Sequence, residues 1–316
     1  MAYIKNNKKY FIPFCVFLIL TIFTFSLFSL SFAQKRQGAF SMDVLKKHEL
    51  FLYPIVRVFA GNAAGSGVLI YSKKDPNNKN EFVSLVLTCH HVVDGLIKYK
   101  KDWDSVIKKN VEKEFLEKGS IEIFEYVRMS KVDSTKRYAA DIIAYDKNHD
   151  LAILRINSPK KFDYWSNLIP KDDIKDLKLF TDVVVSGCSL AHEPFCNFGQ
   201  ITFLNEIIEQ KTFLMSNANS IFGNSGGALF LSENGQLIGI TARITGIQLG
   251  FGFDIMTWMG FSIHPARIYE FIDEQELRFI YDEKDTFKSA MDRREKKKQE
   301  ALMSLKAEFI KEQEIK

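Results

Sequence analysis

The stretch Gly223-Asn224-Ser225-Gly226-Gly227-Ala228 constrains this chain most, because it sets a serine in a glycine turn directly before an apolar run, residues 228–231. Glycines on both sides let the backbone turn sharply and leave the serine hydroxyl open to a substrate. The same turn can aim the amides of Gly223 and Ser225 at one point, where an oxyanion would form. Taken alone, such a stretch fits a plain tight turn as well as it fits a nucleophile.

Two upstream stretches carry the side chains that a reactive serine needs: Thr88-Cys89-His90-His91-Val92-Val93 and Asp150-Leu151-Ala152-Ile153-Leu154. A serine hydroxyl is a poor nucleophile at neutral pH and requires a base within hydrogen-bond reach. Histidine suits this role because its pKa lies near the operating pH, and an aspartate holds the imidazole in the right tautomer. We therefore assign Ser225 as nucleophile, His91 as general base and Asp150 as the orienting carboxylate.

These three motifs resemble those of the trypsin-like (chymotrypsin-fold) serine proteases, with the HtrA/Deg-type branch the most similar. In that branch the histidine lies in Thr-Asn-x-His-Val-Val, the aspartate in Asp-Leu-Ala-x-Leu and the serine in Gly-Asn-Ser-Gly-Gly. The resemblance runs from about residue 53 to about residue 272 and leaves out both ends of the chain. It selects His91 over His90, because the family's histidine directly precedes Val-Val. It also selects Asp150 over its neighbours Asp141 and Asp146, because only Asp150 begins an Asp-Leu-Ala-x-Leu strand.

The resemblance implies an all-β fold of two six-stranded antiparallel β-barrels, with the active site in the cleft between them. It implies a serine endopeptidase that acts on polypeptides, with the Gly223 and Ser225 amides as oxyanion hole and with no metal and no cofactor. HtrA relatives often form trimers, so the resemblance allows a homo-oligomer but leaves the oligomeric state open. Many relatives carry a PDZ domain after the protease domain, and we expect none here. A non-cleaving peptide-binding or chaperone-like protein on the same scaffold is the alternative.

The resemblance also outlines a primary specificity pocket, walled by residues 217–222, 241–244 and 260–263. The position that holds an aspartate in tryptic enzymes is the neutral Asn219, and the branched Ile244 lies where a roomy pocket has glycine. We therefore expect cleavage after small or medium apolar residues such as Ala, Val or Ile. Attraction of acidic residues by Arg243 is the second choice. The expected substrate-binding residues are Asn219, Thr241, Ala242, Arg243, Ile244 and Gly260. Asn224 is neutral, so activation by a new N-terminus that pairs with an aspartate at this position is not expected.

The N-terminal region predicts export. Lys5, Lys8 and Lys9 precede an almost unbroken apolar run from Tyr10 to Ala33. The run is long enough to span a bilayer, at about 20 residues, but small residues before Gln34 also suit signal-peptide cleavage. Residues 1–33 are therefore a signal peptide or a membrane anchor. In either case the rest of the chain is extracytoplasmic, periplasmic or secreted.

The remaining sequence divides into a lead-in segment 34–52, a protease domain 53–278 and a charged helical or disordered tail 279–316. The net charge of +4 is spread along the chain and gives no reason to expect nucleic acid as a partner. None of the four cysteines forms a Cys-x-x-Cys metal pattern. Cys188 and Cys196 are close enough in sequence for a disulfide in an oxidising compartment, with two free thiols as the alternative.

Short apolar segments between polar turns predict the strands. We expect them at 53–59, 65–71, 82–88, 140–145, 151–156, 183–186, 201–204, 213–216, 228–231, 237–243 and 261–263. A surface insertion, residues 94–138, lengthens the interval between the histidine and aspartate motifs, and its lysine-rich part, residues 98–118, is expected to be helical. Pro265 is expected to open a helix that ends near Leu277.

Overall fold

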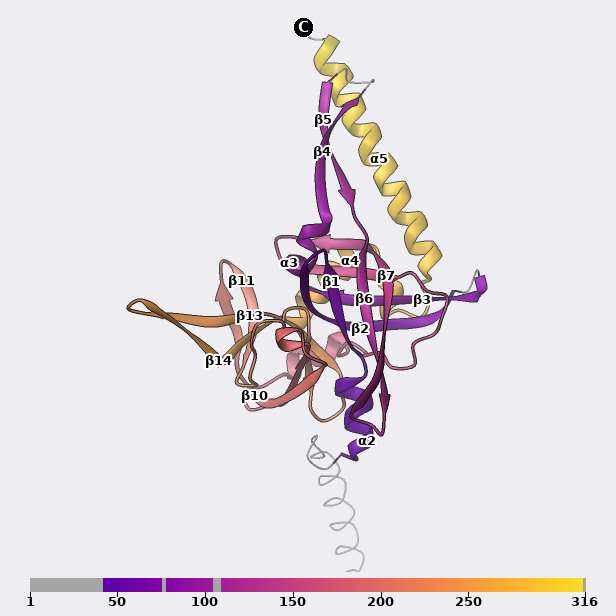
Figure 1. Cartoon of the computed structure of the whole chain (residues 1–316). Helices are drawn as coiled ribbons and strands as arrows, with labels where there is room; N and C mark the ends of the chain where they lie inside the picture. Colours follow the sequence, from indigo (N-terminus) through magenta and orange to yellow (C-terminus); the bar gives the residue numbers. More distant parts are fainter. Residues whose placement is uncertain (1–41, 76–77, 105–108, 315–316) are drawn as a thin grey trace, which may run out of the picture. The chain divides into compact units, whose positions relative to one another are not determined.

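The computed structural model describes residues 42–75, 78–104 and 109–314 (Figure 1). All of these residues except Met42 belong to one compact unit, which begins at Asp43. A second unit, Met1–Met42, lies almost wholly outside the described residues. The apolar run of residues 10–33 is therefore not described, and its role as signal peptide or anchor stays a prediction. Across the described ranges, no helix is both long and apolar enough to cross a membrane.

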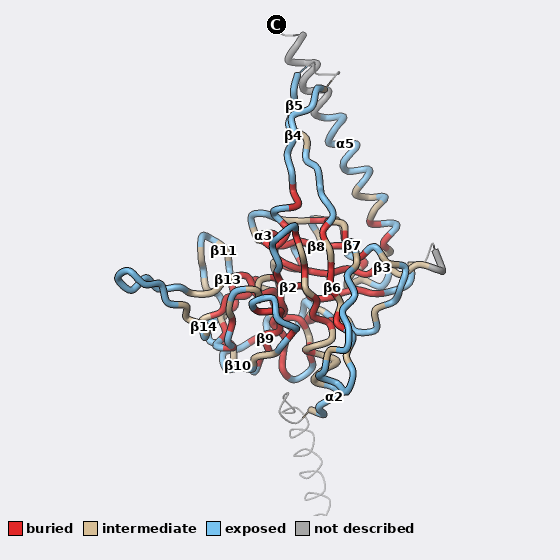
Figure 2. The backbone as a smooth tube through the Cα atoms, in the orientation of Figure 1, coloured by how far each residue is buried: buried red, intermediate tan, exposed pale blue. Residues whose placement is uncertain are grey.

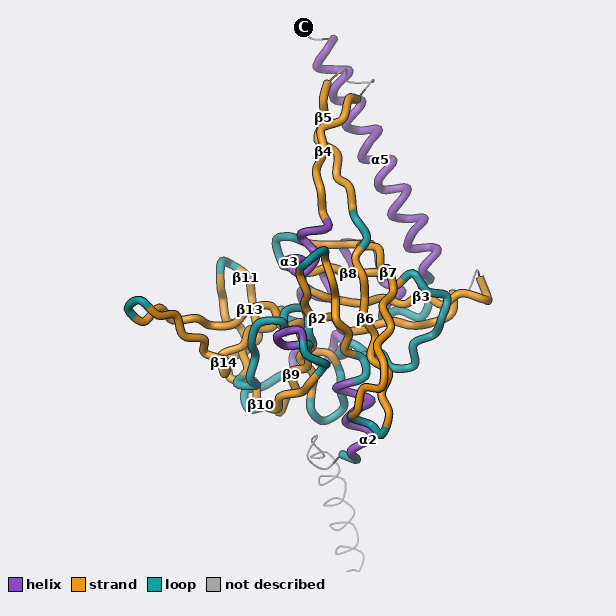
Figure 3. The backbone as a smooth tube through the Cα atoms, in the orientation of Figure 1, coloured by secondary structure: helices purple, strands orange, loops and turns teal. Residues whose placement is uncertain are grey.

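The first half of the unit is a closed barrel of six antiparallel strands (Figures 1 and 3). The strands pair in the order β1-β2-β3-β8-β7-β6. These strands contribute fully buried residues such as Val58, Val86 and Leu154 to the core. The bounds are β1 Ile55–Ala60, β2 Ala63–Asp75, β3 Asn78–Thr88, β6 Gly119–Val127, β7 Lys131–Asp146 and β8 Leu151–Ile156.

The second half repeats this architecture as another closed ring of six antiparallel strands, in the order β10-β11-β14-β13-β12-β9. Its core includes Val183, Leu214, Leu229 and Ile238, all fully buried. The bounds are β9 Asp182–Gly187, β10 Phe195–Ile208, β11 Lys211–Ser216, β12 Ala228–Leu231, β13 Leu237–Leu249 and β14 Gly252–Ile263. The expectation of a mainly β fold is therefore confirmed.

The lysine-rich segment 98–118 forms a β-hairpin, so our expectation of a helix there was wrong. Strand β4, Ile97–Asp104, pairs with β5, Lys109–Leu116. Aromatic residues favour a strand, and two contacts between the strands add to this: Lys113 Nζ lies 2.6 Å from Asp102 Oδ2, and Lys100 Nζ lies over the ring of Phe115. The expected surface insertion, residues 94–138, was also too long at its C-terminal end. Residues 119–138 belong to the barrel, where they form β6 and the first half of β7.

Short helices surround the barrels. The lead-in contains α2, Val44–Lys47, and a π-helical turn, η1, His48–Leu52. Its Phe51 is 1% exposed and packs against the rings of Phe198 and Phe230, so the lead-in is part of the core. The other short elements are α3 His90–Val93, η2 Asp94–Leu96, η3 Lys171–Asp176, η4 Ser189–Ala191 and η5 Arg278–Ile280.

Two longer helices end the chain. Helix α4, Pro265–Glu274, begins with proline in its first turn and with a cap in which His264 accepts a hydrogen bond from the amide of Ala266. Helix α5, Phe287–Glu314, is the charged helix expected in the tail. It is joined to the first barrel near its start, where Arg294 donates to the carbonyl of Ile143 at 2.5 Å. Further along, its described side chains are mostly exposed (Figure 2).

Candidate active site

His91 and Asp150 lie together at one end of the first barrel. Helix α3 follows β3 directly and presents His91, whereas Asp150 stands immediately before β8. Asp150 uses both carboxylate oxygens on His91: Oδ1 accepts from the His91 amide at 2.8 Å and Oδ2 lies 2.7 Å from the ring Nδ1. Since an ionised carboxylate can only accept, Nδ1 carries the proton and Nε2 of the neutral ring is left as a base. This is the tautomer that a serine nucleophile requires.

The turn before β8 fixes the direction of the Asp150 side chain. Asp146 begins it, and its Oδ1 accepts from the amides of Asn148 at 2.8 Å and His149 at 3.1 Å. Asp146 Oδ2 lies 2.8 Å from His149 Nδ1. Asp150 itself has a φ of 60°, a left-handed conformation that aspartate tolerates better than most residues. Backbone in such a rare region is held in place by its surroundings and is frequent at functional sites.

His90, the competing histidine, points elsewhere. It is 5% exposed, its ring packs on Tyr145, and its Nε2 lies 3.6 Å from Asp94 Oδ1. Burial lowers the pKa of His90, although Asp94 and Asp150 act in the opposite direction. The geometry therefore pairs Asp150 with the histidine that the motif selected.

Ser225 lies in the loop before β12, and strand β2 of the first barrel holds this loop. The amide of Ser66 donates to the carbonyl of Ser225 at 2.8 Å, and its hydroxyl donates to the carbonyl of Gly223 at 2.6 Å. The same hydroxyl accepts from the amide of Cys188 at 2.7 Å, and Thr88 Oγ1 donates to the carbonyl of Ser66 at 2.7 Å. Ser66 thus ties the serine loop to the strand that leads to His91. Sequence reasoning missed this role, since the glycines on both sides of Ser66 were interpreted only as part of a strand.

The loop leaves its two expected oxyanion donors available. In the described part of the chain, the amides of Gly223 and Ser225 donate to no acceptor, whereas the amide of Asn224 between them donates to Ile221. Gly223 has a φ of 93° and Gly226 a φ of 84°. Asn224 is buried, and its side-chain oxygen accepts from the hydroxyl of Ser189.

No hydrogen bond joins the Ser225 hydroxyl to His91 within the described ranges. Such bonds are often long until a substrate binds. Cys89, directly before α3, is fully buried, and its thiol donates to the carbonyl of Thr241 at 3.4 Å. Burial and the nearby Asp150 raise the pKa of Cys89 well above its usual range. Cys89, His91 and Asp150 bring atoms of the metal-ligand type within 4.8 Å of one another, but Asp150 already uses both oxygens on His91.

The residues expected to bind substrate lie mostly on β13 and β14. Ile244 is the register partner of Gly260, so the two residues lie side by side on neighbouring strands of one sheet. A Cβ on Gly260 would come within 2.8 Å of Ser220 Oγ, so the two strands and the segment before the serine are closely packed there. Asn219 is exposed and uses its carbonyl to accept from Asn197. Thr241 and Ala242 are buried.

Arg243 differs from its neighbours because its charge has a partner. Its Nη2 lies 2.6 Å from Glu209 Oε2, and its guanidinium stacks on the ring of Phe213. The pKa of Glu209 is accordingly lowered, by the hydrogen bond from Arg243 first and its charge second. Much of the attraction that Arg243 could offer to an acidic substrate residue is therefore used within the protein.

Cys188 and Cys196 are free thiols, so the disulfide is not formed. The β9–β10 register explains this, because it places Cys196 opposite Ser186, whose hydroxyl lies 3.2 Å from its sulfur. Cys188 lies two residues beyond that pair. Burial raises the pKa of Cys188 to about 12 and that of Cys196 to about 11.

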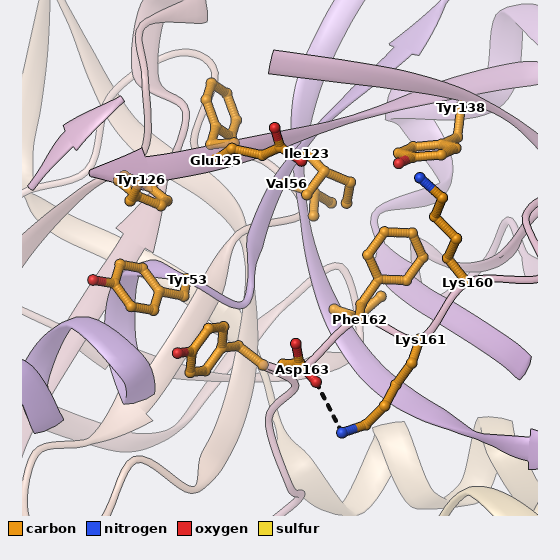
Figure 4. Close-up of a pocket in the computed structure, with 13 residues that line it drawn as sticks. Tyr53, Val56, Ile123, Glu125, Tyr126, Tyr138, Lys160, Lys161, Phe162 and Asp163 are labelled. Atoms are coloured by element: carbon orange, nitrogen blue, oxygen red, sulfur yellow. Dashed lines mark hydrogen bonds and ion pairs between the residues drawn. The ribbon is translucent and has the colours of Figure 1, made fainter. Parts of the chain in front are cut away.

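Two cavities of similar volume differ in whether they adjoin the candidate site. One, of about 370 Å³, adjoins His91 and Asp150 and has residues from both barrels in its walls. The other, of about 350 Å³, lies at the first barrel and contains none of the residues expected at the site. Its walls are largely aromatic, and Lys161 forms an ion pair with Asp163 at its edge (Figure 4).

Arg267 of α4 connects the second half of the chain to the turn that carries Asp150. Its Nη2 lies 2.7 Å from Asp146 Oδ2, and both side chains are about 15% exposed. Burial alone would raise the pKa of Asp146, but hydrogen bonds from Arg267 and His149 outweigh it and lower the pKa. Asp146 is therefore more acidic in the folded than in the unfolded chain. Its stabilisation is complete above the unfolded pKa of about 4 and disappears as the pH falls through the lower folded value.

We expect Asp146→Asn to lower the free energy of unfolding by about 1–3 kcal/mol at pH 7, since charge-assisted bonds are exchanged for neutral ones. The difference from wild type should shrink as the pH falls below about 4. Denaturant titrations of both proteins between pH 7 and pH 2 measure this. A difference that stays constant or grows in acid would contradict the role given to Asp146.

The chain is similar to known proteases in sequence and in structure. Residues 65–240, more than half of the chain, match the model of the trypsin-like peptidase domain. The chain is 26% identical over 253 residues to "Protease Do-like 1, chloroplastic" of Arabidopsis thaliana, which covers 77% of this chain and 54% of that protein. This chain thus spans about half the length of that curated relative.

Among solved structures, HtrA-type protease AlgW with tripeptide is similar at a TM-score of 0.50, with 18% identity over 75% of this chain and 64% of that one. An identity this low supports the fold alone. The match to the family model supports membership of the family as well as the fold, because it includes both the serine loop and the strands that hold His91 and Asp150. The chain therefore belongs to the family of trypsin-like peptidase domains, the serine protease hydrolases.

Proposed function

We propose that this protein is a serine endopeptidase in which Ser225, His91 and Asp150 act as a triad in the cleft between the two barrels. Nε2 of His91 takes the proton of Ser225 as the hydroxyl attacks the peptide carbonyl, and it later gives that proton to the leaving amine. Asp150 keeps the imidazole oriented and stabilises its charged form. The amides of Gly223 and Ser225 stabilise the oxyanion.

The observation that supports this most strongly is the two-point contact of Asp150 with the amide and the ring of His91. A structural ion pair has no need to fix the ring tautomer in this way. The unoccupied amides on both sides of Asn224 support it independently, because a tight turn kept only for packing would normally use such donors.

The substrate in this proposal is a polypeptide, cleaved after a small or medium apolar residue. Support comes from the neutral Asn219 and from the branched side chain of Ile244, which lies next to Gly260 in the β13–β14 register. The proposal also includes export directed by residues 1–33, to a periplasmic or secreted location, and self-association as in HtrA relatives. A reporter that works only outside the cytoplasm, fused after Ile272, tests the export, and a signal from a cytoplasmic reporter alone would overturn it.

A digest of a peptide library tests the pocket. We expect the wild type to cleave mainly after Ala, Val or Ile, with graded preferences, since apolar pockets discriminate by only about 10–200-fold per methylene. Ile244→Gly should widen the preference toward aromatic residues. Dominant cleavage after Arg or Lys would refute the pocket assignment. Binding of the library without any cleavage would instead favour a non-cleaving peptide-binding protein.

A further inference from the structure

The cavity beside His91 has walls from both halves of the chain. The first barrel contributes the segment around His91 and the turn before Asp150, which carries Lys147. The second contributes the start of β11, which carries Lys211, and a part of β13. The lining residues are His90, His91, Asp94, Lys147, Asp150, Lys211, Ala242 and Arg243.

The charged side chains in this cavity differ in whether they have a partner of opposite charge. Of its two carboxylates, Asp150 is bound to His91, and Asp94 lies beside His90 with its side chain 63% exposed. Arg243 is paired with Glu209. Lys147 and Lys211 have no carboxylate within 4.0 Å of their ammonium groups anywhere in residues 42–75, 78–104 and 109–314. Neither lysine is therefore held in an ion pair, although the charge of Lys211 helps to lower the pKa of Glu209. The two lysines come from different barrels.

We propose that Lys147 and Lys211 together bind an acidic side chain of the substrate, so that the protease prefers polypeptides with Asp or Glu close to the cleaved bond. This inference rests on the proposed endopeptidase function and names its substrate class. The acidic residue is not the one whose carbonyl is attacked. That residue must face Ser225 and the amides of Gly223 and Ser225, and neither Gly223 nor Ser225 lines this cavity.

The position of the lysines is what makes the proposal specific. Isolated surface lysines are ordinary, but these two come from different barrels and share one cavity of about 370 Å³ with the base His91. A substrate carboxylate in this cavity would be attracted by the charges of both ammonium groups. Arg243, the cation that sequence reasoning selected, is less suited because Glu209 already accepts from it.

Matched peptides test the proposal. Each pair carries Glu or Gln at one position near a cleaved bond, and kcat/KM is measured for the full-length protein. At low salt we expect wild type to prefer Glu by about tenfold at one position, the size that two partly exposed ion pairs provide. The preference should fall toward unity at about 1 M salt, where screening is strong. Lys147→Gln and Lys211→Gln should each weaken it several-fold, and the double variant should abolish it.

Charge reversal gives the sharper result. Lys147→Glu and Lys211→Glu should each favour Lys over Gln at the same position, whereas Lys175→Glu, an equal change at an exposed site outside the cavity, should behave as wild type. If wild type cleaves peptides with no preference for Glu, or keeps the preference in the double variant, this inference fails and the proposed function stands. If neither member of any pair is cleaved by wild type, the endopeptidase proposal itself fails.

Discussion

Replacing Ser225 or His91 by alanine is expected to lower kcat for peptide hydrolysis by roughly a factor of 10⁶, and Asp150→Ala by roughly 10⁴. The three side chains act as one unit, so the loss of any one removes most of what the unit contributes. Asp150 has the smaller effect because His91 can still accept a proton when its ring is less well oriented. Single-turnover and steady-state rates on a cleavable peptide measure these losses.

His90→Ala is the matched control, because it removes a neighbouring histidine that faces Tyr145 and Asp94 instead of Asp150. It should retain most of the activity. Substrate affinity should also survive in Ser225→Ala, since the cleft is unchanged. If His90→Ala lost the activity and His91→Ala kept it, the assignment of the base would be wrong.

The second large effect is expected at Gly226. Its φ of 84° is disfavoured for any residue with a Cβ, and a Cβ there would lie 2.1 Å from Thr88 Oγ1 and 2.2 Å from the carbonyl of Ser66. These atoms are held by their own hydrogen bond and cannot both retreat. We expect Gly226→Ala to displace the serine loop, with a loss of kcat of at least about 100-fold and a fall in stability of about 3 kcal/mol or more.

Gly61→Ala is the control variant, because it introduces the backbone strain of a positive φ without a steric clash of the new Cβ. Gly61 also has a positive φ, 61°, but a Cβ there would meet nothing within 4 Å. The variant should lose only about 1 kcal/mol of stability and keep its activity. Activity assays and thermal unfolding of both variants provide the comparison. Equal effects at the two glycines would show that the close approach of Gly226 to Ser66 and Thr88 has no special importance.

Sequence reasoning worked best where a strand is bounded by turns. The expected strands 151–156 and 228–231 match β8 and β12 residue for residue. Each is an apolar run, interrupted in β8 only by Arg155, that follows a turn rich in polar residues or glycine. The contact of His91 with Asp150 was also anticipated, because both residues lie in motifs that resemble those of the trypsin-like serine proteases.

The errors came from features that depend on a partner strand. Residues 98–118 are rich in lysine and have no wide apolar face, so the local pattern did not show that Tyr99 and Phe115 would face Glu114 and Lys98 across a hairpin. The disulfide expectation failed because sequence distance does not reveal register. Ser66 was missed for the same reason, since its hydrogen bonds go to residues far away in the chain.

The most direct test of the central claim is the site of reaction with a fluorophosphonate probe, located by mass spectrometry after digestion of the labelled protein. Such probes react with serine hydroxyls that a neighbouring base has activated. We predict a single adduct, on Ser225, that disappears in Ser225→Ala, is strongly reduced in His91→Ala and persists in His90→Ala. Undiminished labelling of Ser225→Ala, or an adduct on a different serine, would contradict the assignment of Ser225 as the nucleophile.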